Sequence, residues 1–216
     1  MTKFLREPIN SLTHLGGAAF GVLALILMLT KQLPTTSFGL STIAIIVFGV
    51  SLILLYGTSG IYHAIFGDDA RLYQWRRLDH SMIFVLIAGS YAPFCLITLN
   101  NPAGWGLFAT ITSLAVIGII FKLVWFNCPR WLSTAIYIIM GWSVIFLVSP
   151  LMQALATPAL ILLVAGGIFY TIGGIIYAIK PNFLKVTGLG FHEIFHIFTL
   201  LGSISHFLCV YFFVIN

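Results

Sequence analysis

The chain has 216 residues, of which 60% are hydrophobic and only 7% are charged, and its net charge is +5. A soluble globular domain carries about 25% charged residues, so this composition argues against a water-soluble protein. The ten basic residues lie between apolar runs and form no patch. They therefore give no support to nucleic-acid binding and fit membrane topology instead.

Seven apolar runs follow one another, and each is long enough for a membrane-spanning helix, which needs about 20 residues. Turn residues and prolines separate them. Strands of a membrane barrel are about 10 residues long and alternate in polarity, which these runs do not. We predict an all-α membrane protein, a single seven-helix bundle over residues 1–216. The expected spans are about 12–30, 40–66, 78–99, 105–126, 132–148, 158–179 and 191–214.

The basic residues divide unequally between the two ends of these spans. Nine of the ten fall on the side of the N-terminus, and Lys31 alone falls on the other. Because loops rich in Lys and Arg stay in the cytoplasm, we predict a cytoplasmic N-terminus and an outer C-terminus in the cell membrane. The nine are Lys3, Arg6, Arg71, Arg76, Arg77, Lys122, Arg130, Lys180 and Lys185.

The last predicted span carries a pair of histidines on one face. His192 and His196 are four residues apart, so both imidazoles can reach one metal ion. Hydrogen bonding between helices is the simpler alternative for either histidine alone. The string His192-Glu193-x-x-His196 also matches the zincin protease pattern, but Glu193 points about 100° away from His192. Glu193 is therefore interpreted as a neighbour of the site.

Other candidates lie at the ends of other predicted spans. Ser59 and His63 are four residues apart near the end of the second span, and Asp79 opens the third. Asp79 has a simple alternative role as a helix N-cap. With the N-terminus inside, these residues share the cytoplasmic depth of His192 and His196, which independent structural residues need not do. We therefore predict one shared site.

The remaining polar residues near this depth have mixed interpretations. Glu7, Asn10 and His14 share a face at the start of the first span. They are either neighbours of the site or a solvated, amphipathic first turn. His206 lies about 15 Å deeper in the last span and His80 points about 100° away from the face of the site, so neither is an expected ligand.

The expected metal is zinc. Three neutral imidazoles, from His63, His192 and His196, suit zinc with the fourth position left for water, which is the open arrangement of catalytic sites. Asp79 could then accept a hydrogen bond from that water, as a base or as an orienting group.

At these residues, the sequence resembles the hemolysin III family of bacterial membrane proteins. That family belongs with the progestin and adipoQ receptors, which include the adiponectin receptors. The matching motifs run through nearly the whole chain in the order of the family. They are Glu7-x-x-Asn10-x-x-Thr13-His14, Ser59-x-x-x-His63, Leu78-Asp79-His80, Ala88-Gly89-Ser90-Tyr91-x-Pro93, and His192-x-x-x-His196 with Gly202-Ser203-x-x-His206-Phe207.

The resemblance implies a seven-helix bundle with its N-terminus inside and a zinc ion held by His63, His192 and His196. It implies that Ser59 and Asp79 lie beside the metal, Asp79 through a water. Adiponectin receptors have been linked to ceramidase-type hydrolysis of lipid amides. The resemblance therefore implies a zinc-dependent hydrolase that acts on ceramide-like or related acyl substrates, with Asp79 and Ser59 as candidate catalytic residues and membrane lipids as partners.

Two other functions stay open. A non-catalytic sensor or regulator of membrane lipids would use zinc as a structural pin between spans. A pore-forming or cytolytic protein, the activity that the family name records, would use the polar face of the last span as a water path. The sequence holds no soluble, inserting toxin domain that would explain cytolysis.

Overall fold

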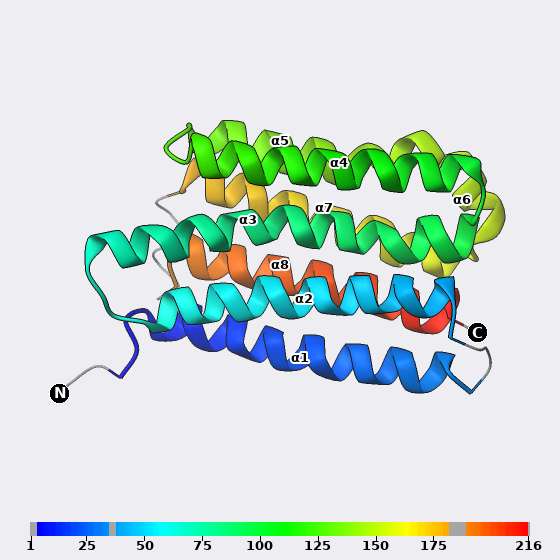
Figure 1. The fold of residues 1–216 in the computed structure, drawn as a ribbon, viewed down its shortest axis with the longest axis horizontal. Coiled ribbons are helices and arrows are strands. Elements are labelled where there is room, and N and C mark those ends of the chain that lie inside the picture. Colours follow the sequence, from blue (N-terminus) through cyan, green and yellow to red (C-terminus); the bar gives the residue numbers. More distant parts are fainter. Residues whose placement is uncertain (1–3, 35–37, 182–188, 216) are drawn as a thin grey trace.

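The computed structural model describes residues 4–34, 38–181 and 189–215, and all regular secondary structure within these ranges is helical (Figure 1). Seven helical segments in this part of the chain are long and apolar enough to cross a membrane, so the chain is a multi-pass membrane protein. The elements are α1 (Pro8–Gln32), α2 (Leu40–Ala64), α3 (Asp69–Pro93), the π-helix η1 (Phe94–Leu99), α4 (Pro102–Val124), α5 (Arg130–Trp142), the 3-10 helix η2 (Ser143–Leu147), α6 (Val148–Ala154), α7 (Thr157–Ile179), α8 (Phe191–Cys209) and the π-helix η4 (Val210–Val214).

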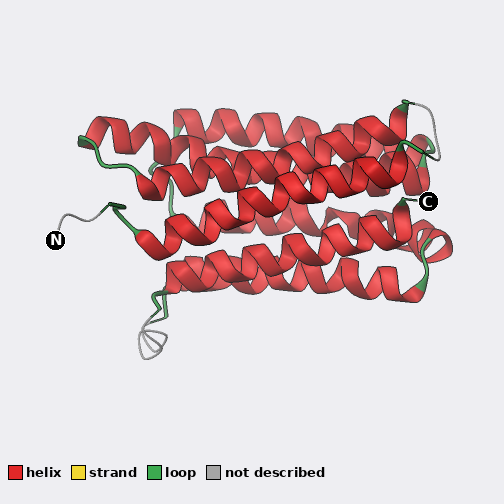
Figure 2. Ribbon diagram, turned by 90° about the horizontal axis from the view of Figure 1, so that it is seen from below, coloured by secondary structure: helices red, strands yellow, loops and turns green. Residues whose placement is uncertain are grey.

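The helices form one up-and-down bundle (Figures 1 and 2). From α1 to α4, each helix packs against the next, and α5 packs against α7. Helix α8 contacts both α7 and α1, so the last helix closes the bundle against the first. This closure brings the beginning of α8 beside the beginning of α1.

The third span starts nine residues before the expected 78–99, because the helix begins at Asp69. Asp68 is the N-cap, and its side chain accepts a hydrogen bond from the backbone N–H of Arg71 at 2.8 Å. The interpretation of Asp79 as an N-cap is therefore wrong, since Asp79 lies well inside the helix. The first turns of α3 project beyond the end of α2 (Figure 1), where polar side chains need no apolar surroundings.

The fifth span also differs from the expected 132–148. It continues without a break from α5 through η2 into α6 and ends at Ala154. Pro150 does not stop it, because Pro150 lies in the first turn of α6, where its missing N–H would have no partner inside that helix.

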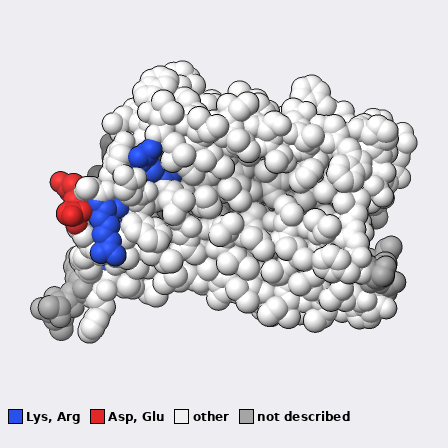
Figure 3. All heavy atoms as spheres, in the orientation of Figure 1, with Lys and Arg blue, Asp and Glu red and all other residues white. Residues whose placement is uncertain are grey.

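Apolar side chains cover the outside of the bundle as well as its centre. Ile117, Ile139 and Phe146 are among many large side chains that stay exposed, as expected for surfaces that face lipid. The described basic residues other than Lys31 lie at the end that carries the N-terminus, and Figure 3 shows charged atoms gathered there on the visible face. At the opposite end, Lys31 Nζ donates to the carbonyls of Tyr211 and Ile215 at 2.7 and 2.8 Å.

A close crossing of α2 and α3 gives a stability prediction. A Cβ atom at Gly89 would overlap the side chain of Ser51 on α2, whereas one at Gly16 on α1 would meet no atom within 4 Å. We expect Gly89→Ala to lower the free energy of unfolding by about 1–3 kcal/mol, the usual cost of overpacking. Gly16→Ala, the matched control, should leave stability unchanged or slightly raised because alanine favours helix. Thermal unfolding in detergent measures both, and equal melting temperatures would contradict this assignment of the crossing.

Candidate metal centre

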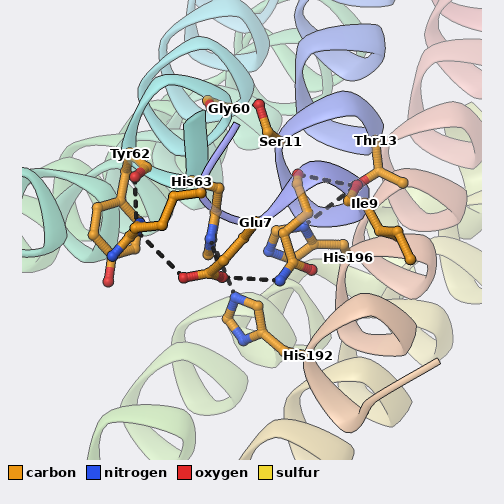
Figure 4. Close-up of polar contacts among 11 residues, drawn as sticks. Glu7, Ile9, Ser11, Thr13, Gly60, Tyr62, His63, His192 and His196 are labelled. Atoms are coloured by element: carbon orange, nitrogen blue, oxygen red, sulfur yellow. Dashed lines mark hydrogen bonds and ion pairs between the residues drawn. The ribbon is translucent and has the colours of Figure 1, made fainter. Parts of the chain in front are cut away.

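Three histidines from two distant segments meet at the N-terminal end of the bundle (Figure 4). His63 is on the last turn of α2, and His192 and His196 are on the first turns of α8. One nitrogen of each ring lies within 4.8 Å of the others, and His63 and His196 are 2% and 1% exposed. The cluster can therefore hold a metal ion.

Glu7 determines which nitrogen of His63 is free for a metal. Its Oε2 atom lies 2.7 Å from His63 Nδ1. The hydrogen bond with His63 lowers the pKa of the Glu7 carboxyl from 4.5 to about 2, against the opposite effect of burial. Because an ionised carboxylate only accepts, Nδ1 is the donor, and in the neutral ring the lone pair that can bind a metal is then on Nε2.

The donor set fits zinc. The Nε2 atoms of His63 and His192 are 3.2 Å apart. Two nitrogens at 2.0–2.1 Å from a tetrahedral zinc ion would be separated by about 3.3 Å. A carboxylate that orients a ligating histidine is a common companion of such ions. His63, His192 and His196 would hold the ion, with Glu7 behind His63.

The chain before α1 places Glu7 over His63. The backbone N–H groups of Arg6 and Glu7 donate to the carbonyls of Ala64 and His63 at 3.2 and 3.0 Å. Arg6 Nη2 donates to the carbonyl of Tyr62 at 2.8 Å (Figure 4). These bonds satisfy the free carbonyls at the end of α2. The same segment therefore caps this helix and orients His63.

The first turns of α1 are buried against the cluster, so the interpretation as a solvated amphipathic turn is wrong for Asn10 and His14. They are 4% and 3% exposed. Asn10 Nδ2 donates to Glu7 Oε2 at 3.0 Å. The ring of His14 stacks on that of His196, with centroids 3.4 Å apart and an interplanar angle of 9°. Helix α1 therefore supports both histidine-bearing segments.

Asp79 and Ser59 lie on one wall of a cavity that reaches the histidines. The Ser59 hydroxyl lies close to the Asp79 carboxylate. Both residues line the same cavity of about 330 Å³ as His192 and His196. Its other lining is mainly apolar and includes Phe94, Leu147, Leu151, Leu160 and Leu163. From Asp79 to Phe94 the wall follows α3 and the start of η1 for about 22 Å at the rise of a helix.

Three polar residues on α3 and α8, His80, His206 and Glu193, lie outside the histidine cluster. His80 Nε2 lies 3.4 Å from the hydroxyl of Tyr177, and His206 Nε2 lies 3.2 Å from the carbonyl of Leu163. Within the described ranges, Glu193 makes no hydrogen bond or ion pair with the histidines. It therefore offers no general base of the zincin kind.

Two contributors to the site escape sequence reasoning. Tyr177 packs its ring 5.7 Å from that of His192, and Arg6 closes the end of α2. A tyrosine in an apolar span does not indicate by its sequence context that it lies beside a metal site. Pro8 does indicate where the first helix starts, because proline is common at the first position of a helix. It therefore marks the preceding Glu7 as the N-cap.

Glu7→Gln should weaken zinc binding by about 10–100-fold, because the amide still reaches His63 but no longer carries the charge that favours the ligating tautomer. Glu193→Gln is the matched control on the first turn of α8 and should leave affinity unchanged. Competition with a chromogenic chelator measures both affinities. Equal affinities in the two variants would show that Glu7 does not support the metal site.

Comparisons with known proteins agree over the full length of this fold. The family model described as Haemolysin-III related matches residues 2–207. A Bacillus cereus protein named Hemolysin-3 is 41% identical, and the match covers 100% of this chain and 95% of the relative. A Hemolysin-3 homolog of Bacillus subtilis (strain 168) is 35% identical, with 100% and 98% covered. The motif-bearing helices and the histidine cluster all lie within the matched residues.

Proposed function

Because this chain belongs to the Haemolysin-III related family and buries a cluster of His63, His192 and His196, we propose that it is a zinc-dependent hydrolase of lipid amides or related acyl lipids. The observation that carries the proposal is the position of the cluster at one end of a long, mainly apolar cavity. A metal that only pinned helices together would need no such cavity beside it.

Zinc is the metal that the ligands favour. Zinc binds neutral imidazoles through a ring nitrogen, and the contact between Glu7 and His63 Nδ1 leaves Nε2 of His63 toward His192. When bound, zinc supplies Lewis-acid activation of a carbonyl group and of a water molecule. Apart from Glu7, no carboxylate has a described hydrogen bond to these histidines, so the protein supplies one carboxylate support and three nitrogen ligands.

Asp79 is the proposed proton acceptor. Asp79 lines the cavity that His192 and His196 also line, and the nearby Ser59 hydroxyl would orient its carboxylate. In hydrolysis, Asp79 takes the proton of the attacking water and delivers it to the leaving amine. Ser59 is 1% exposed, which suits a positioning group better than a nucleophile.

The cavity accounts for a lipid substrate. Its apolar walls, from Ile83 on α3 to Phe94 on η1 and from Leu160 to Tyr170 on α7, suit an acyl chain, with the scissile carbonyl next to Asp79. The small number of polar groups at one end would fix the direction in which the chain enters.

We place this end of the bundle on the cytoplasmic side. The described cations Arg6, Arg71, Arg76, Arg77, Lys122, Arg130 and Lys180 support that orientation. Lys31, the cation at the other end, is bonded to backbone carbonyls there.

Turnover of a defined substrate panel tests the proposal. Purified protein in lipid nanodiscs should contain about one zinc ion per chain and release fatty acid from ceramide or an N-acyl amide. The rate should fall on treatment with a zinc chelator and return on adding zinc back. Full zinc occupancy without hydrolysis of any ceramide, acyl amide or acyl ester would reject the enzyme and favour a structural metal in a lipid sensor.

A further inference from the structure

A second, smaller cavity lies at the same end of the bundle, on the other side of His80 and Tyr177. It measures about 200 Å³ and is bounded by α3, α4, α5 and α7. His80 and Tyr177 line both cavities. The other lining residues are Arg76, Lys122, Phe126, Asn127, Cys128, Arg130 and Ser133. Unlike the first cavity, this one is cationic.

Three cations, Arg76, Lys122 and Arg130, line this cavity, and none of them forms an ion pair with a carboxylate among the described residues. The two ion pairs among the described residues both involve Glu7, which belongs to the histidine cluster. The arginines lie instead over aromatic rings, Arg76 at 5.3 Å from Phe126 and Arg130 at 5.2 Å from Tyr177. Among the described residues, buried Arg130 Nη1 makes no hydrogen bond.

Lys122 is the most deeply buried of the three, at 2% exposed. Its Nζ atom donates to Ser133 Oγ and to Cys128 Sγ, and an ammonium group has three donors, so one donor remains. Neither partner, the Ser133 hydroxyl or the Cys128 side chain, belongs to a carboxylate that would balance the charge of Lys122. Burying a cation without a counter-charge is costly, so an anion in the cavity would remove the cost.

The start of α5 adds to this positive potential. Pro129 is its N-cap and provides no side-chain acceptor, so no side chain caps the first N–H groups of this 13-residue helix. Arg130 and Ser133, in its first turns, line the cavity. A helix N-terminus carries partial positive charge and favours phosphate groups, here in addition to three full charges.

We propose that this cavity binds a phosphoryl group, carried either by the head group of an anionic phospholipid or by free phosphate. Two arginines offer planar paired donors, and Lys122 and the hydroxyl of Ser133 supply further contacts for a tetrahedral anion. Asn127, which is exposed in the turn between α4 and α5, marks the opening toward the aqueous side. The proposal does not depend on hydrolysis at the histidine cluster.

Binding of two probes to purified protein in neutral detergent tests the site. One arm adds sodium phosphate against sodium chloride at equal ionic strength, and the other adds phosphatidic acid against phosphatidylcholine in mixed micelles. Thermal stabilisation reports apparent affinity in both arms. The test variant is Arg76→Gln with Arg130→Gln. Arg71→Gln, an exposed arginine on the first turn of α3, is the matched control.

We expect wild type and Arg71→Gln to respond equally and the double variant to bind at least about tenfold more weakly, since it loses charge-assisted hydrogen bonds. The pair Arg76→Lys and Arg130→Lys, which keeps the charge, should recover part of the affinity. A monodisperse gel-filtration peak and an unchanged helical circular dichroism spectrum show that each variant is folded. A response to phosphatidic acid alone assigns a lipid head group, and a response to phosphate alone assigns the free anion. No specific response in either arm, or an unchanged response in the folded double variant, would overturn the proposal.

Discussion

His63→Ala should reduce bound zinc from about one ion per chain to a trace, with an affinity loss of more than about a hundredfold. His63 joins α2 to the two ligands of α8, and its loss leaves only His192 and His196 on one helix. The expected effect exceeds that of losing an outer carboxylate, which costs about 10–100-fold. Elemental analysis after dialysis against a weak chelator gives the occupancy.

His206→Ala is the control for this loss. His206 is also a buried histidine of α8, but its Nε2 atom faces the carbonyl of Leu163, away from the cluster. The His206→Ala variant should keep full zinc occupancy even if its melting temperature is lower than that of the wild type. Full zinc occupancy in His63→Ala would show that His63 is not a ligand. The spacing between the Nε2 atoms of His63 and His192 would then not reflect metal binding.

Asp79→Asn should keep the zinc and lower the rate of lipid hydrolysis by about 10²–10⁴-fold, the range for removing a general acid or base. The amide occupies nearly the same volume beside Ser59 but accepts no proton. The measurements are zinc content and turnover on whichever lipid of the panel is cleaved. The variant thus separates proton transfer from metal binding.

Ser90→Ala provides the comparison on the same helix face and in the same cavity. The hydroxyl of Ser90 donates to the carbonyl of Ile87, so its removal should change turnover little. If Asp79→Asn is as active as Ser90→Ala, Asp79 is not the proton acceptor. If Asp79→Asn loses its zinc, Asp79 acts in binding and the two roles are not separate.

Much of the bundle follows from the length and polarity of the apolar runs. The runs predict where the chain crosses the membrane, but charged helical turns outside the membrane leave no apolar signal. For that reason the first turns of α3, with Arg71 and Arg76, read as a loop. The same misreading made Asp79 seem to open a helix when Asp68 does so.

The histidine cluster could be predicted in part. The four-residue spacing of His192 and His196 reports a shared helix face, and the charge asymmetry puts His63 at the same depth. The contact between Glu7 and His63 could not be predicted. It depends on the chain before α1 crossing the end of α2, a matter of tertiary packing across 56 residues.

The cationic cavity escaped for a different reason. In the sequence, Arg76, Lys122 and Arg130 are explained fully by membrane topology, and that explanation leaves no reason to ask where their side chains point. Only the folded bundle brings three helices together so that these side chains line one space.

The closure of α8 against α1 has a consequence for synthesis in the cell. The ligand His63 comes from α2, which is synthesised early, and the other two ligands come from α8, which is synthesised last. Glu7 belongs to the first part of the chain to leave the ribosome. A nascent chain that has inserted six spans holds a single ligand, His63. A metal ion bound by all three histidines therefore requires the seventh span to be in place.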